Sequence, residues 1–121
     1  MDRDRAIALI EQRRDAWLHE DVDAYLRLFA DEFAFFVNGV ELTRGLPALA
    51  NAVRRSYLRF RPGAWEFHHI AVDRSCVLTE WTATMQERTS GETRMIRAMS
   101  SCELRDDLAI WQREYRSPPV G

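Results

Sequence analysis

Apolar and polar residues alternate most clearly in the C-terminal half of the chain. Between 94 and 104, Ile96 falls on one face of an extended segment and Arg97 on the other, and the alternation continues along the segment. Segments rich in β-branched and aromatic residues, 77–84 and 108–115, lie before and after it. The polar breaks between the segments are too short for a helical crossover. We therefore predict three consecutive antiparallel strands.

Helical spacing dominates the start of the chain. Asp2 or Asp4 is placed to cap a helix whose apolar positions include Ile10 and Trp17. Charged residues, Arg13 among them, fill the remaining positions, so we expect them to face solvent. A helix with a single apolar side needs a sheet to lie on.

The remaining segments complete the predicted fold. The pattern predicts a second helix over 22–30, a strand over 33–37, a return strand over 40–42, a third helix over 47–60 and a strand over 65–72. Asn38-Gly39 is typical of a tight hairpin turn. Helices that are segregated from a mostly antiparallel sheet define an α+β fold. We expect a curved sheet over three helices, with an apolar, cone-shaped interior.

Length, charge and cysteine usage limit the class of protein. The 121 residues fit one domain, residues 1–121. A net charge of −2 provides no basic surface for nucleic acid or an anionic membrane. We find neither an apolar run that could span a bilayer nor a signal peptide, and we expect a cytoplasmic protein. In that reducing compartment Cys76 and Cys102 are expected to be free thiols that pack as small hydrophobes.

The absence of lysine excludes several kinds of chemistry. All 17 basic residues are arginine, so Schiff-base catalysis, a pyridoxal cofactor and a P-loop lysine are ruled out. The sequence also lacks a nucleophile-elbow motif, a Gly-rich phosphate loop and any cluster with metal-ligand spacing. We therefore expect no cofactor and no metal.

Five segments in a characteristic order point to a family. They are Ala16-Trp17 followed by Glu20-Asp21-Val22-Asp23, then Phe29-Ala30-Asp31-Glu32-Phe33, Arg44-Gly45, Thr79-Glu80-Trp81-Thr82-Ala83 and Arg113-Glu114-Tyr115. Through these segments the chain resembles the NTF2-like superfamily of cone-shaped α+β barrels, and within it the SnoaL-like and limonene-epoxide-hydrolase-like branch. The resemblance implies cofactor-free chemistry on small molecules and a homodimer that forms through the sheet.

The resemblance also locates positions that are catalytic in relatives. The central-strand Arg and Asp of limonene-type epoxide hydrolases fall on Trp81 and Ala83, and their last-strand Asp has an acidic counterpart in Glu114. The region that carries the Asp base of ketosteroid isomerases reads Val37-Asn38, and their helix-one Tyr corresponds to about Arg13. Both catalytic sets are therefore incomplete in this chain.

Glu114 is the leading candidate for a proton-handling group. The resemblance directs it into the cone beside Gln112, where burial against Trp81 would favour the protonated acid and suit acid or base catalysis. The alternative is a structural ion pair with an arginine, such as Arg97 or Arg113. Periodicity alone would instead bury the other face of the last strand, which a second subunit would then cover.

His69 is a second catalytic candidate. His68 and His69 are adjacent in a predicted strand, so we expect them to face opposite sides and not to share a metal. One of them could reach the cone and act with Glu114; the alternative is a partly buried structural histidine or a residue at the rim.

Large side chains supply candidate ligand contacts. We expect these residues to line an apolar binding site for a small organic molecule: Trp17, Tyr25, Phe35, Tyr57, Trp81 and Gln112. Core packing is the alternative for most of the aromatic rings. Two functions remain open: ligand binding with cofactor-free isomerase, cyclase or hydrolase chemistry, or a non-catalytic ligand-binding, dimerisation or scaffold module.

Overall fold

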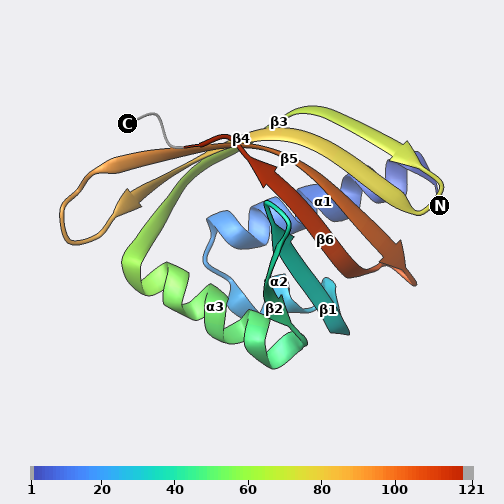
Figure 1. The fold of residues 1–121 in the computed structure, drawn as a ribbon, viewed down its shortest axis with the longest axis horizontal. Helices are drawn as coiled ribbons and strands as arrows, with labels where there is room; N and C mark the ends of the chain where they lie inside the picture. Colours follow the sequence, from blue (N-terminus) through green and yellow to red (C-terminus); the bar gives the residue numbers. More distant parts are fainter. Residues whose placement is uncertain (1, 119–121) are drawn as a thin grey trace.

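The computed structural model describes residues 2–118, which form three helices and six strands. The elements are α1 (Arg3–Leu18), α2 (Val22–Leu26), β1 (Phe29–Val37), β2 (Val40–Arg44), α3 (Leu46–Arg59), β3 (Phe60–Asp73), β4 (Cys76–Glu87), β5 (Thr93–Arg105) and β6 (Leu108–Arg116). One sheet contains all the strands in the order β2-β1-β6-β5-β4-β3, and only β1 and β6 pair in parallel. The sheet is curved and unclosed, and the helices lie on its concave side (Figure 1). The predicted α+β class is confirmed.

Helix α1 lies against the sheet with a stripe that includes a charge. Asp2 caps the helix by accepting a hydrogen bond from the Asp4 backbone N–H at 3.1 Å. The buried side chains are Ala6, Leu9, Ile10 and Arg13. The expectation that Arg13 faces solvent is therefore wrong. Its spacing from Ile10 and Trp17 places it on the same face of the helix as these apolar residues.

The second helix is shorter than its apolar stripe suggested. It ends at Leu26, and the chain enters β1 at Phe29, where Phe29 and Phe33 are almost fully buried. Together with residues of α3 such as Leu49 and Val53, these rings form the main core. None of the helices in the described part of the chain is both long and apolar enough to cross a membrane.

The predicted Asn38-Gly39 hairpin turn is confirmed. Both residues have positive φ, 50° at Asn38 and 83° at Gly39, as a two-residue type I′ turn requires. The Asn38 side chain also accepts a hydrogen bond from the backbone N–H of Arg116 at 2.9 Å. The turn between β1 and β2 is thus tied to the end of β6.

A β-bulge in β6 determines which residues of this strand face the helices. Leu104 pairs with Ala109, but Glu103 pairs with Trp111, so Ile110 is an extra residue in the ladder. Ala109 is buried before the bulge, and Gln112 and Glu114 are buried after it. The periodicity, which buries the other face of the strand, is therefore correct before the bulge. The resemblance, which directs Glu114 and Gln112 inward, is correct after it.

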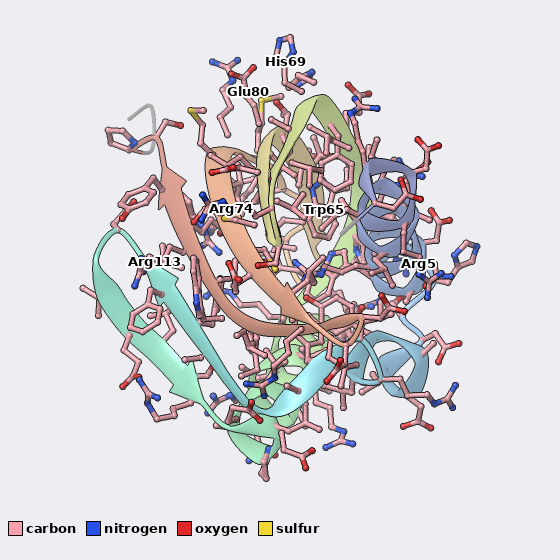
Figure 2. All side chains as sticks on the ribbon, turned by 90° about the vertical axis from the view of Figure 1, so that its right-hand side faces the viewer. Arg5, Trp65, His69, Arg74, Glu80 and Arg113 are labelled. Carbon is pink, nitrogen blue, oxygen red and sulfur yellow. The ribbon has the colours of Figure 1, made fainter. Side chains whose placement is uncertain are left out.

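A second bulge, in β3, changes the placement of the two histidines. Phe67 pairs with Trp81 and His69 pairs with Glu80, which leaves His68 as the extra residue. His68 bonds to Thr82, and both histidines are exposed on the face of the sheet that is turned away from the helices. Figure 2 shows His69 and Glu80 projecting together from the ribbon. The expectation that the histidines face opposite sides is wrong because the bulge interrupts strict alternation.

Candidate functional site

A chain of buried polar side chains crosses the space between α1 and the sheet. Arg13 donates from Nη1 to the side-chain oxygen of Gln112 and from Nη2 to Cys102 Sγ, at 3.4 Å for the sulfur. Gln112 in turn donates to Glu114 Oε1 at 3.2 Å. Arg116 Nε donates to the other Glu114 oxygen at 2.5 Å. We call these five residues, which come from α1, β5 and β6, the polar chain.

Glu114 is buried, and each of its carboxylate oxygens accepts a hydrogen bond. Its side chain is 4% exposed, whereas that of Arg116 is 34% exposed and reaches solvent. Arg116 forms an ion pair with this buried carboxylate. The ion pair that we considered as the alternative for Glu114 is therefore present, but its partner is Arg116 and not Arg97 or Arg113.

Arg13 stays charged although it is buried. Burial lowers the pKa of its guanidinium, but Cys102, Tyr25 and Glu114 raise it more, so that the net pKa lies above the ordinary value. The Arg13 guanidinium also lies 4.8 Å from the centre of the Phe29 ring, a favourable cation–π distance. Burial raises the pKa of Tyr25 to about 12, and the nearby Arg13 charge opposes this increase.

A small internal cavity adjoins the polar chain. Its volume is about 10 Å³, and its lining includes Arg13, Cys102 and Gln112 together with Trp65 and Trp81. A space of this size holds about one water-sized group. Trp65 and Phe67 form the side of the cavity at β3, the edge strand, where both are only partly buried. Figure 2 shows Trp65 inside the ribbon, beside α1.

The predicted ligand-contacting residues are divided between two places. Trp81 and Gln112 line the internal cavity. The others form part of a packed series of rings along the core: Trp17, Tyr25, Phe29, Phe33, Phe35 and Tyr57. The Tyr57 hydroxyl donates a hydrogen bond to the Trp17 carbonyl at 2.8 Å, in the C-terminal turn of α1.

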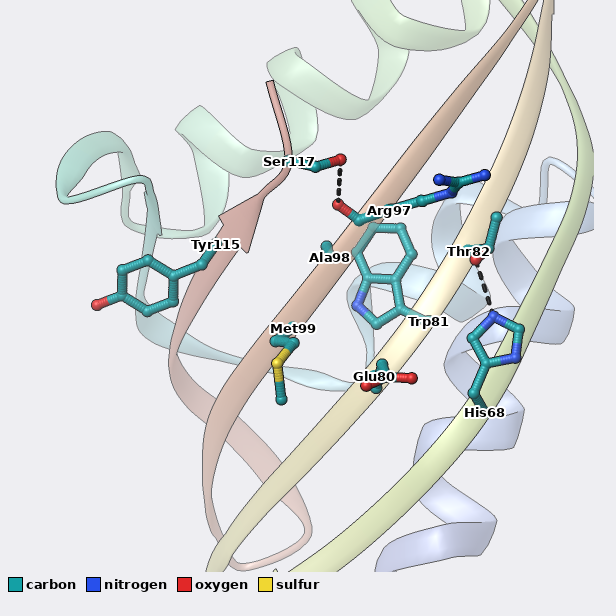
Figure 3. Close-up of a pocket in the computed structure, with 9 residues that line it drawn as sticks. All are labelled: His68, Glu80, Trp81, Thr82, Arg97, Ala98, Met99, Tyr115 and Ser117. Atoms are coloured by element: carbon teal, nitrogen blue, oxygen red, sulfur yellow. Dashed lines mark hydrogen bonds between the residues drawn. The ribbon is translucent and has the colours of Figure 1, made fainter. Parts of the chain in front are cut away.

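The structure does not bring His69 to Glu114. His69 belongs to the outer face of the sheet, while Glu114 is buried on the inner face. On that outer face His68 lines an open groove of about 420 Å³ over β3, β4, β5 and β6 (Figure 3). Glu80, Arg97 and Tyr115 line the same groove. The catalytic pairing of His69 with Glu114 is therefore not supported by the geometry.

Sequence reasoning missed three participants in the site. The charge pattern predicts that Arg13 faces solvent, but its spacing from Ile10 and Trp17 indicates the buried stripe. Trp65 begins the predicted strand over 65–72, and the predicted ligand contacts do not include it. Arg116 lies two positions after Glu114, and this same-face spacing along a strand was the available signal.

The described residues offer no evident metal centre. No group of three or more His, Cys, Asp or Glu side chains between residues 2 and 118 is arranged to hold a metal ion. Cys76 and Cys102 are free thiols, partly buried and buried respectively. The chemistry that this site offers is hydrogen bonding and charge.

Comparison with known proteins identifies the family. The sequence profile described as "SnoaL-like domain" matches residues 10–112, which is most of the chain. The chain belongs to the SnoaL-like domain family. No curated protein sequence matches this SnoaL-like protein.

Solved structures agree with the SnoaL-like fold. An LEH-like epoxide hydrolase from M. tuberculosis is similar with a TM-score of 0.82 and 24% identity, over 93% of this chain and 83% of that one. A proposed polyketide cyclase from Xanthomonas campestris pv. campestris gives 0.79 and 21%, over 95% and 92%. A proposed isomerase from Bacillus subtilis gives 0.83 and 14%, over 95% and 88%. At these identities the likeness establishes the fold and not the reaction.

Proposed function

We propose that this SnoaL-like protein binds a small, mostly apolar organic molecule between α1 and the concave face of the sheet. The observation that carries the proposal is the polar chain, which is buried beside aromatic rings and next to a cavity. Burying charged groups costs stability, and a purely structural core of this size needs none of them. Relatives of the same fold described as a hydrolase, a cyclase and an isomerase support a role with small molecules.

Binding requires the interior to open. The cavity of about 10 Å³ admits one water-sized group, so a larger ligand must displace side chains. Phe67 on the edge strand is the natural part to move, because it is only partly buried and has no neighbouring strand on its outer side. Opening there would expose Gln112 and Arg13 to the polar end of the ligand.

A pair of matched variants tests the location of the ligand. Thr79 lines the cavity, whereas Leu78, its neighbour on β4, is 42% exposed on the outer face. Calorimetric titration with 2-naphthalenemethanol should show binding to the wild type and to Leu78→Phe, and no binding to a folded Thr79→Phe variant, whose ring fills the cavity. Equal binding to both variants would place the ligand elsewhere and contradict the proposal.

Acid–base catalysis at Glu114 is a second candidate function. It is supported by the burial of Glu114 and by its hydrogen bond to Gln112, which lines the cavity. Glu114 can accept a proton from a ligand only when Arg116 swings away into solvent. Glu114→Gln should then abolish turnover of a panel of epoxides and enolisable ketones, followed by mass spectrometry, while ligand affinity is kept. Unchanged turnover in this variant would leave binding as the function.

We also propose that two copies associate through the outer face of the sheet. This face exposes the apolar side chains Leu78, Met95, Met99 and Tyr115. It also carries Glu80 and Arg97, and neither is in an ion pair within residues 2–118. A two-fold axis can place the apolar centre of this face against that of the second copy, and each charge against the opposite charge of that copy. A second copy of the chain is therefore the partner that this surface favours.

A further inference from the structure

The internal cavity has a size and lining that suit a single oxygen atom. It lies where α1 faces β3, β4, β5 and β6, and its volume of about 10 Å³ corresponds to about one water-sized group. Polar side chains from four elements line it, among them Arg13, Thr79, Ser100 and Gln112. An acceptor atom in this space would be surrounded by hydrogen-bonding groups and enclosed by rings.

Two donors beside the cavity have no acceptor. Arg13 Nε and Trp65 Nε1 are buried, and neither finds a hydrogen-bond partner in the part of the chain that the structure describes. Both residues line the cavity. The other tryptophan at this site differs, because Trp81 Nε1 donates to Ser100 Oγ at 2.9 Å. Buried donors are almost always paired, so two unpaired donors around one cavity indicate an acceptor that comes from outside the chain.

The charges of the site indicate that this acceptor is anionic. Glu114 forms its ion pair with Arg116, and no described carboxylate forms one with Arg13. The polar chain thus contains two guanidinium groups and one carboxylate, which leaves it with a surplus of one positive charge. Only 5% of Arg13 is exposed, so solvent does little to stabilise this charge. A negatively charged oxygen would restore the balance, whereas a neutral hydroxyl would not.

We propose that the ligand carries an anionic oxygen, as in a carboxylate or an enolate, and that Arg13 Nε and Trp65 Nε1 bind this oxygen inside the cavity. This assignment rests on the proposed binding function and specifies the class of ligand. The apolar body of the ligand would lie against Trp81 and take the space opened by Phe67. Charge-assisted bonds from a guanidinium and an indole give the site a preference for the anion over its neutral analogue.

Two probes of nearly the same shape test the proposal. Calorimetry with 2-naphthoate and 2-naphthalenemethanol should show that the wild type binds the anion about tenfold more tightly. Trp65→Phe removes one donor and keeps a ring, and it should weaken naphthoate binding about tenfold while alcohol binding changes by less than about twofold. Trp111→Phe, which changes a tryptophan outside the cavity lining, is the matched control and should leave both affinities unchanged.

A second measurement does not depend on a folded variant. In the wild-type ¹H–¹⁵N spectrum, the Trp65 indole N–H signal should move downfield on addition of naphthoate and stay in place with the alcohol. Equal affinity for the two probes, with a static Trp65 signal, would overturn the anionic site and leave the proposed binding function standing. Failure of both probes to bind would overturn both proposals.

Discussion

Arg13 brings a full charge into the protein interior, and its neighbours offset only part of the cost. Gln112 and Cys102 accept hydrogen bonds from its guanidinium, and the Phe29 ring lies 4.8 Å away. None of these partners carries the opposite charge of a carboxylate. Because burial of a charge costs several kcal/mol before compensation, the stability of the domain should respond unequally to changes in the polar chain.

Removing the negative charge of Glu114 should therefore lower the free energy of unfolding more than removing the positive charge of Arg13. Glu114→Gln leaves the polar chain with two guanidinium groups and no carboxylate, and we expect a loss of about 2 kcal/mol in the free energy of unfolding. Arg13→Met removes the surplus charge, keeps the ion pair of Glu114 with Arg116, and should change stability by less than about 1 kcal/mol. Urea denaturation at neutral pH measures both. The opposite order of the two effects would show that the charges do not interact as described.

Tyr25 should make the domain sensitive to alkaline pH. Burial raises its pKa from 10.0 to about 12, so the folded state holds the phenol proton more tightly than the unfolded chain does. The resulting stability is fully present below pH 10.0 and is lost as pH rises toward about 12. The loss is of the order of 2 kcal/mol.

The variant Tyr25→Phe isolates this effect. Its stability should fall less between pH 9 and pH 12 than that of the wild type, measured by urea denaturation at each pH. Tyr57, whose pKa is also raised by burial, is present in both proteins and cancels from the comparison. Parallel pH curves for the two proteins would show that Tyr25 titrates alike in the folded and unfolded states.

At the scale of the elements, the local signals were predictive wherever side-chain spacing followed a regular period. The strand alternation at 94–104 corresponds to β5, and the Asn38-Gly39 turn has the expected backbone. The bulges at His68 and Ile110 could not be predicted, because one added residue leaves no compositional mark. Each bulge changed which residues reach the interior. The histidines were misplaced for this reason, and the two assignments for β6 conflicted for the same reason.

The turn at Asn38 should contribute measurably to stability. Asn38→Ala removes a side-chain acceptor for the Arg116 N–H and places alanine at a φ of 50°, so we expect a loss of about 1–2 kcal/mol. Asn38→Asp keeps an acceptor oxygen and a side chain that tolerates this conformation, and should lose less than about 0.5 kcal/mol. Thermal unfolding of the two variants beside the wild type decides the matter; equal losses would show that the hydrogen bond and the turn geometry contribute little.

For the whole molecule, the order of elements was enough to predict the architecture, but the pairing of polar side chains in the interior was not predictable. Helices followed by a mostly antiparallel sheet allow few arrangements, and the observed curved sheet over three helices is one of them. The parallel pairing of β1 with β6 joins segments far apart in sequence, and it brings Val37 opposite Glu114. Contacts of this kind, including that between Arg13 and Gln112, depend on the complete fold and not on any local pattern.

The exposed outer face of the sheet leads to a prediction about assembly. If two copies meet there, Met99→Glu, at a site that is 58% exposed, should place two like charges near the two-fold axis and weaken association at least tenfold. Leu58→Glu is the matched control, because Leu58 is an apolar residue that is 80% exposed on α3, away from this face. Sedimentation velocity over a range of concentrations gives the dissociation constant for each protein.

Charge reversal gives the sharper form of this test. Glu80 and Arg97 line the same groove of the outer face, so in a two-fold dimer each can meet the other on the partner copy (Figure 3). Glu80→Arg and Arg97→Glu should each weaken the dimer, because each brings like charges together, and the double variant should restore it. Restoration would require that the two residues interact across the interface. A wild type that sediments as a monomer at every concentration, or single variants that associate as well as the wild type, would show that a second copy does not cover this face.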